Sequence, residues 1–274
     1  MSYNLDDLLY LMRRLRDPDG GCPWDLAQDF QSITPSTIEE AYELVDAIYQ
    51  LHEQGDAENA RQVQEELGDL LFQVVFYSQM GQEKGWFGFA DVVDSIAAKL
   101  VRRHPHVFPD GDLHGRYASP PDTETIKQQW ESIKEEERRG KAMHGVLDDV
   151  PLALPALARA QKLQKRASRV GFDWPDARSA LTKIREELDE LEQALQQHNT
   201  EAVAEEMGDF LFSCVNVARH LKVDAETALG ACNRKFEKRF RYLESQLQQQ
   251  GRSPEDVSLM EMDSLWQQAK HQLD

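Results

Sequence analysis

The chain has 274 residues, of which 29% are charged and 41% hydrophobic, and its formal net charge is −18. This charge disfavours binding to duplex nucleic acid, because such proteins need Lys and Arg to displace counterions from phosphates. A membrane-spanning helix needs an apolar run of about 18 residues, and no run in the sequence is that long, so no membrane association is expected. We expect a globular cytoplasmic protein, and the length favours two domains.

Nearly every long segment has apolar residues at helical spacing, and no short run alternates as a strand would, so we predict an all-α fold. Residues 1–18 read as an amphipathic helix rather than a leader peptide. Ser36 or Thr37 is predicted to cap a helix with an apolar stripe over 38–48, which ends before Gly55.

The next helix is predicted from its apolar stripe over 63–75 and ends near Gly81, where GWFGF breaks the pattern. A further helix is expected from about Asp91 to His104, because Pro105 disfavours helical geometry in the residue before it. Residues 102–122 are rich in Pro, Gly and Asp, which is typical of a long functional loop. One more helix is expected over 122–139.

Two prolines and two glycines lie between helical patterns at 140–160, which favours a domain boundary there. We predict an N-terminal domain over 1–140, a linker over 141–154 and a C-terminal domain over 155–274.

Several motifs occur twice and in the same order. EEAYE at 39–43 matches EELDE at 186–190, EELGD at 65–69 matches EEMGD at 205–209, and WESIK at 130–134 matches WQQAK at 266–270. Lys99 and Arg103 likewise match Lys235 and Arg239, and Trp24 matches Trp174. This ordered series indicates a tandem duplication.

The repeated motifs carry acidic residues at helical spacing. Glu40 and Glu43 are three apart on one predicted helix, and Glu66 and Asp69 are three apart on the next. If these helices pack antiparallel, four carboxylates meet at a half-buried seam, where their repulsion calls for a cation. All-oxygen ligation favours Mg²⁺, or else Mn²⁺. The second copy offers Glu187, Glu190, Glu206 and Asp209.

A simpler interpretation is that these glutamates only face water, as most helical Glu pairs do. The duplication of both clusters, with Gly68 and Gly208 also matching, argues against it, and each glycine is predicted to allow a close helix approach. We expect the preceding residues to be solvated: Glu39, Glu65, Glu186 and Glu205. A di-iron bundle needs Glu-x-x-His motifs, which neither cluster contains.

The paired EExxE and ExxD motifs, the HPHVF segment and the Trp-x-x-x-Lys near the end of each half resemble the MazG family, within the all-α NTP pyrophosphatase superfamily. The resemblance spans essentially the whole chain. It implies Mg²⁺-dependent hydrolysis of nucleoside triphosphates to monophosphates and pyrophosphate, a homodimer, and broad substrate tolerance. It also implies that activity resides mainly in the C-terminal domain.

By position, the resemblance assigns metal binding to Glu187, Glu190, Glu206 and Asp209. It assigns substrate binding to Lys183, Asn233, Lys235, Arg239, Trp266 and Lys270, the cations being suited to triphosphate oxygens. The first half has Ser36 and Ala97 where the second has Lys183 and Asn233, so we expect it to be weak or inactive. Ala202 stands where the family pattern has a lysine.

For the chemistry, we expect the metal cluster to activate a water for attack on phosphorus, with Glu186 or Glu187 taking its proton. Two alternatives remain open. The enzyme could be a narrower dNTP pyrophosphatase, similar to a dUTPase or dCTPase. The chain could instead be a helical adaptor with acidic binding faces, although that does not explain the repeated Lys and Arg. Trp266 is equally consistent with a core residue.

Overall fold

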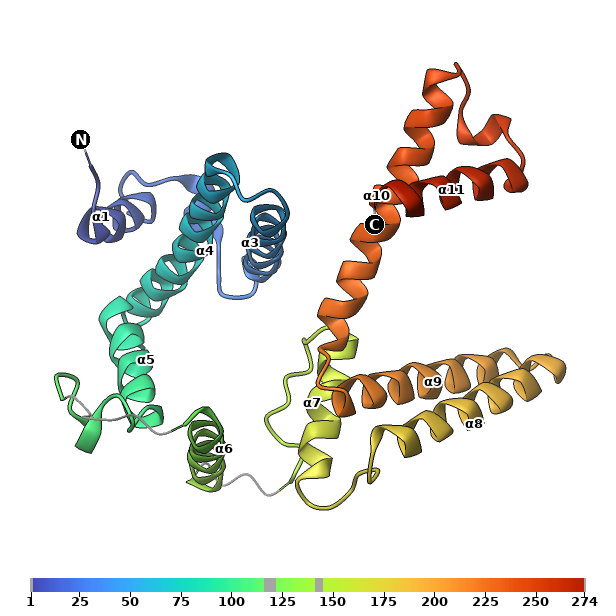
Figure 1. The fold of residues 1–274 in the computed structure, drawn as a ribbon. Coiled ribbons are helices and arrows are strands. Elements are labelled where there is room, and N and C mark those ends of the chain that lie inside the picture. The colour runs from blue at the N-terminus through green and yellow to red at the C-terminus, as the bar shows by residue number, and fades with distance from the viewer. Residues whose placement is uncertain (1, 116–121, 141–144, 274) are drawn as a thin grey trace. The chain divides into compact units, whose positions relative to one another are not determined.

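The computed structural model describes residues 2–115, 122–140 and 145–273. Its regular elements are all helices over these ranges, which confirms the predicted all-α class (Figure 1). None of the helices described is long and apolar enough to cross a membrane. The chain divides into two compact units, Met1–Glu137 and Arg138–Asp274. The linker predicted over 141–154 lies partly outside the described residues and stays a prediction.

The first unit is built around the antiparallel helices α3 and α4, with α1 and α5 packed on α4. Its core joins Met12 and Ile33 to Val75, Phe76 and Met80. The helices of this half are α1 (Leu5–Leu15), α2 (Pro23–Ala27), α3 (Thr34–Gln54), α4 (Ala57–Glu83), α5 (Phe89–Arg103) and α6 (Thr123–Gly140), with the short 3₁₀ helix η1 (Pro109–Gly111).

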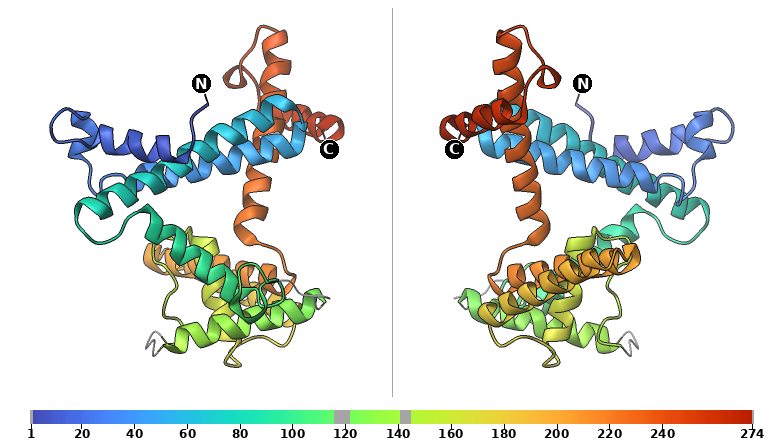
Figure 2. Two further views of the ribbon diagram at one scale, coloured as in Figure 1. Left: turned by 90° about the vertical axis from the view of Figure 1, so that its left-hand side faces the viewer. Right: turned by 90° about the vertical axis from the view of Figure 1, so that its right-hand side faces the viewer.

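The second unit repeats this arrangement with α8 and α9, which lie side by side in both turned views (Figure 2). Helix α7 packs on α9, and α10 packs on α7, α9 and α11. Leu243 and Leu247 of α10 form a small core with Leu265 of α11. The helices are α7 (Ala156–Ser168), α8 (Ala177–Gln196), α9 (Thr200–His220), α10 (Ala225–Gln249), the 3₁₀ helix η2 (Pro254–Asp256) and α11 (Leu259–Leu273).

The prediction that Ser36 or Thr37 forms the N-cap of α3 is wrong. Helix α3 begins at Thr34 with Ile33 at its N-cap, and Pro35 lies in its first turn, where the missing N–H costs nothing. The Thr37 hydroxyl instead contacts the Ile33 carbonyl and, at 2.9 Å, the Tyr77 hydroxyl. The C-terminal end is as predicted, because Gly55 adopts the left-handed conformation (φ 64°).

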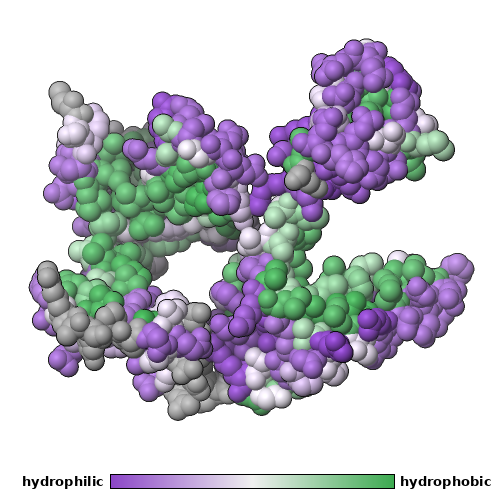
Figure 3. Space-filling model, in the orientation of Figure 1, coloured by the Kyte–Doolittle hydropathy of each residue, from purple (hydrophilic) through white to green (hydrophobic). Residues whose placement is uncertain are grey.

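Apolar residues stay exposed on both helices of each antiparallel pair. On α8, Leu181, Leu188 and Leu195 recur every seventh residue and are 42%, 43% and 54% exposed. The stripe predicted over 38–48 is likewise about half exposed at Ile38 and Ile48. Figure 3 shows such apolar patches along α4 and α9. Each half therefore leaves an uncovered apolar face beside its acidic residues.

The expected close helix approach at the two matching glycines is not found among the residues that the structure describes. A Cβ atom added at Gly68 or Gly208 would meet open space among the described residues. Both glycines lie on the exposed side of their helix pair.

Candidate functional site

The second half brings three of its four predicted carboxylates together. Glu187 and Glu190 lie one turn apart on α8, and the antiparallel packing of α9 brings Glu206 to them. One oxygen from each of the three lies within 4.8 Å of the others. Asp209 lies outside this group of three, but it lines the same cavity as Glu187. The cluster is an all-oxygen donor set, which suits a hard divalent cation.

Mutual repulsion and burial act on the cluster together. The pKa of Glu190 is raised, first because burial disfavours its charged form and also because the Glu187 and Glu206 carboxylates lie close by, while Lys183 opposes the shift. A neighbouring cation would stabilise the charged form of this carboxyl group. The donor set and its electrostatics therefore fit a divalent metal.

Lys183, from the expected substrate-binding set, contacts the cluster directly. Its ammonium lies 2.8 Å from one oxygen of Glu186 and 2.8 Å from one of Glu187. These two contacts raise the pKa of Lys183, so it stays charged. The Glu187 side chain is only 5% exposed, which makes this a largely buried ion pair beside the cluster.

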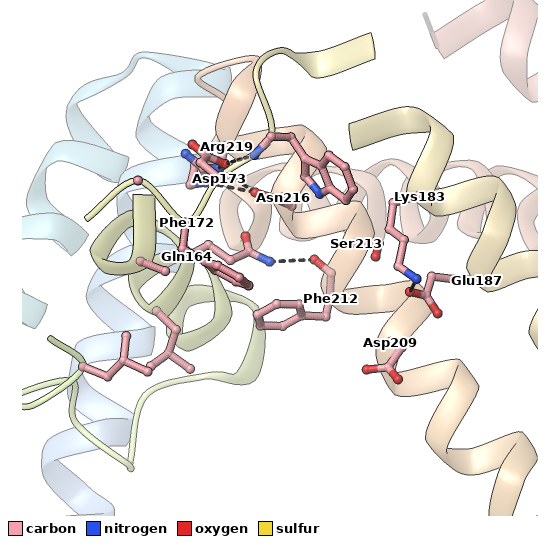
Figure 4. Close-up of a pocket in the computed structure, with 15 residues that line it drawn as sticks. Gln164, Phe172, Asp173, Lys183, Glu187, Asp209, Phe212, Ser213, Asn216 and Arg219 are labelled. Carbon is pink, nitrogen blue, oxygen red and sulfur yellow. Dashed lines mark hydrogen bonds and ion pairs between the residues drawn. The ribbon is translucent and has the colours of Figure 1, made fainter. Parts of the chain in front are cut away.

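A cavity of about 700 Å³ opens next to the carboxylates. Figure 4 shows Lys183, Glu187 and Asp209 on one side of it, and Gln164, Phe172, Asp173 and Arg219 on the other. It is lined by Leu147, Leu163, Gln164, Ala167, Gly171, Phe172, Asp173, Trp174, Lys183, Glu187, Asp209, Phe212, Ser213, Asn216 and Arg219. Most of these residues have no spacing signal in the sequence. Lys183, Glu187 and Asp209 are predicted from the sequence, and Trp174 is marked by its match with Trp24.

An ionic clamp holds one wall of this cavity. Gly171 (φ 85°) turns the chain after α7, and Asp173 then forms an ion pair with Arg219 near the end of α9. Asp173 also accepts from the Trp174 N–H at 2.9 Å and contacts His220 at 3.1 Å. Burial opposes ionisation, but the Arg219 guanidinium holds the pKa of Asp173 below its ordinary value. The clamp fixes the loop that carries Trp174.

The remaining expected substrate-binding residues lie on α10 and α11. Asn233 and Lys235 are exposed on α10. The Arg239 guanidinium lies 5.7 Å from the centre of the Trp266 ring. Lys270 lies one turn beyond Trp266 on α11, and none of these five is among the described residues that line the cavity. In Figure 1, α10 begins near the ends of α7 and α9 and runs away from α8 and α9, the two helices that carry the carboxylates.

The first half gathers its own carboxylates without a lysine. Glu40, Glu43 and Glu66 each place one oxygen within 4.8 Å of the others. Burial raises the pKa of Glu40, as do Asp69 and the other two cluster carboxylates. The pKa of Glu66 is raised for the same reasons. Ser36 occupies the position equivalent to Lys183, so this position supplies no ammonium to offset the repulsion in the first cluster.

The arginine that matches Arg239 has a carboxylate partner in the first half. Glu137 of α6 accepts hydrogen bonds from both Arg102 and Arg103, with closest distances of 2.6 Å to each guanidinium. These contacts lower the pKa of Glu137 to about 2. When WESIK is aligned with WQQAK, the position equivalent to Glu137 is Leu273. The two halves thus hold their matching arginines in different surroundings.

Comparison with known proteins agrees with the duplication. The model of the MazG nucleotide pyrophosphohydrolase domain matches residues 28–108 and 176–243. The chain is 48% identical to the nucleoside triphosphate pyrophosphohydrolase of Escherichia coli (strain K12), over 98% of this chain and 97% of that protein. It is 41% identical to the nucleoside triphosphate pyrophosphohydrolase/pyrophosphatase MazG of Thermotoga maritima, over 97% and 95%. With two copies of the domain and such similarity along its whole length, the chain belongs to the MazG family of nucleotide pyrophosphohydrolases.

Proposed function

We propose that the second half of this chain hydrolyses nucleoside triphosphates, both NTPs and dNTPs, to nucleoside monophosphates and pyrophosphate in a Mg²⁺-dependent reaction. The observation that carries the proposal is the meeting of Glu187, Glu190 and Glu206 within 4.8 Å at the edge of a cavity large enough for a nucleotide. Two relatives that cover nearly the whole chain have names that state the same activity.

In this proposal Glu187, Glu190, Glu206 and Asp209 hold Mg²⁺. The bound ion would lower the pKa of a water molecule and offset negative charge on the phosphates. Mn²⁺ prefers similar oxygen ligands and is expected to substitute.

The side chains around the cluster then handle phosphate charge and a proton. Lys183 is fixed by Glu186 and Glu187 and faces the cavity, where its ammonium can attract phosphate oxygens. Glu186 is 56% exposed and lies beside the cluster, and we propose that it accepts the proton of the attacking water. No covalent nucleophile is required.

We propose that the protein acts as a homodimer. The exposed leucines on α8 and the exposed Met207 and Leu211 on α9 form an apolar surface that a second copy would bury. Lys235 and Arg239 lie outside the cavity lining, and we propose that the dimer brings these cations from one copy to the phosphates bound by the other. Substrate selection then involves both copies.

We propose that the first half is weak or inactive and supports the second. Its cluster can hold a cation, but it lacks the equivalents of Lys183 and Asn233, and Glu137 competes with phosphate for Arg103. A change in the second cluster should therefore affect turnover far more than the matching change in the first.

A panel of NTPs and dNTPs, assayed for monophosphate and pyrophosphate release with and without Mg²⁺, tests the function. The proposal expects Mg²⁺-dependent pyrophosphate release from most of the panel. Turnover of a single dNTP would instead favour a narrower pyrophosphatase, similar to a dUTPase or dCTPase. Absence of any turnover, together with absence of thermal stabilisation by a non-hydrolysable NTP analogue, would favour the adaptor.

A further inference from the structure

Helix α10 is linked at its start to α7 by side chains of both helices. The amide nitrogen of Gln161 donates to the main-chain carbonyl of Val223 at 3.1 Å, and the amide oxygen accepts from the Ala225 N–H at 3.0 Å. In return, the Glu226 carboxylate of α10 accepts from the Ala158 N–H of α7 at 3.3 Å. We call these three hydrogen bonds the α7–α10 brace.

The brace satisfies amides that a helix cannot pair within itself. The first N–H groups of a helix have no intrahelical partner. Ala225 is the first residue of α10, and Ala158 is the third residue of α7. Pro155, the N-cap of α7, makes no side-chain hydrogen bond, so Glu226 takes this role and places its negative charge at the positive end of the helix dipole. Each helix therefore caps the other.

The buried residues of α10 lie far from the brace. Leu243 and Leu247 are near the end of the helix and pack with Leu265 of α11. In Figure 1, the helix between these two regions runs away from α8 and α9. Lys235 lies ten residues after Ala225, about 15 Å along the helix, so a tilt of about 10° at the start displaces it by about 3 Å. A displacement of this size breaks a hydrogen bond to a phosphate oxygen.

We propose that Gln161 is a positioning residue for the reaction, because the brace sets the direction of α10 and thereby the location of Lys235 and Arg239. The inference rests on the proposed function, in which these two cations reach the bound phosphates. Gln161 is outside the cavity lining, so its effect on substrate binding passes through α10.

The first half has a leucine at the corresponding junction. Leu9 of α1 lines a cavity of about 370 Å³ together with Gly88 and Phe89, where α5 begins. A leucine side chain makes no hydrogen bonds, so the two bonds of Gln161 have no equivalent at Leu9 in the half that we propose to be weak or inactive. Gln161→Leu therefore places at the α10 junction a side chain that the α5 junction already accommodates.

Binding of a non-hydrolysable NTP analogue in the presence of Mg²⁺ tests how Gln161 acts. Gln161→Leu should weaken binding by about tenfold, as the loss of one or two hydrogen bonds does. In a chain that carries Lys235→Met and Arg239→Met, the same change should alter the affinity by less than about twofold, because the cations that the brace positions are gone. An unchanged affinity of Gln161→Leu, or equal weakening in both backgrounds, would overturn the positioning role.

Leu9→Ala is the matched control in the first half. It removes packing from the first core and should lower stability but leave the affinity for the analogue unchanged. Weaker binding by this control, equal to that of Gln161→Leu, would overturn the proposal, since general loss of stability would then explain both results.

Distances between spin labels test the brace without any substrate. The labels are attached at Gln193→Cys on α8 and Glu244→Cys on α10, in a chain whose native cysteines are replaced by alanine and which is mixed with excess unlabelled chain. Gln161→Leu should broaden the distance distribution by about 5 Å, the displacement at Glu244 for a tilt of about 10°. An unchanged width would overturn the brace. If the wild type hydrolyses no NTP, the proposed function fails, and a broadened distribution would still support the brace.

Discussion

Lys183→Met tests how the second carboxylate cluster is held together. The variant removes an ammonium that lies 2.8 Å from Glu187, whose side chain is only 5% exposed. The direct attraction at this distance is about 6 kcal/mol at an effective dielectric constant of about 20, but dehydration offsets most of it. Removing one partner of a buried pair costs about 3–5 kcal/mol. Because Lys183 is itself 29% exposed, we expect a loss of about 2–3 kcal/mol in the free energy of unfolding.

Mg²⁺ should rescue much of that loss, because a cation bound to the cluster neutralises Glu187 in place of Lys183. The assay is urea denaturation of the wild type and the variant, each in EDTA and in saturating Mg²⁺. Lys162→Met, which removes an exposed lysine of α7, is the control and should change stability little in either condition. A penalty for Lys183→Met that is the same with and without Mg²⁺ would refute the reasoning.

Three further outcomes follow from the described contacts. The folded pKa of Glu137 is about 2 against an ordinary 4.5, so its contact with Arg103 stabilises the fold above pH 4.5 and is lost as the pH falls toward 2. After solvent screening, we expect the contact to contribute about 1–2 kcal/mol to the free energy of unfolding. Glu137→Gln should remove this contribution, and with it the corresponding loss of stability at acid pH in denaturation curves. Asp173→Asn breaks the clamp on Arg219 and should raise KM several-fold with little change in kcat; an unchanged KM would count against the clamp. Leu188→Asp places a charge on the exposed stripe of α8 and should give monomers by light scattering, whereas wild-type mass would contradict the proposed dimer surface.

Much of the fold was predictable because helix periodicity and turn residues act locally. The ends of α3 and α4 at Gly55 and beyond Gly81 follow from such signals. The start of α3 differs from the prediction because Ser36 and Thr37 are common N-cap residues, whereas Pro35, a signal for a first turn, lies inside the helix that begins at Thr34. The exposed stripes were not predictable, since periodicity tells which face is apolar but not whether the same chain covers it.

The carboxylates were predictable because their spacing places them on one face of each helix, and their repetition separates them from the many other acidic residues. The wall of the cavity opposite the carboxylates was not predictable. Gln164 depends on the Phe212 carbonyl 48 residues away, and neither of the two glutamines on α7 has a distinctive spacing. The ion-pair partner of Arg219, Asp173, likewise comes from a distant loop. Long-range contacts of this kind leave no periodic trace in one sequence.

A matched pair of substitutions tests the central claim most directly. Glu190→Gln and Glu43→Gln change equivalent residues in the two clusters, and each removes one carboxylate charge without changing side-chain size. Pyrophosphate release from an NTP with Mg²⁺ should fall by about 100-fold or more in Glu190→Gln, as loss of a metal ligand does, and stay within about threefold of wild type in Glu43→Gln. Unchanged turnover in Glu190→Gln, or an equal loss in both variants, would contradict the assignment of catalysis to the second half.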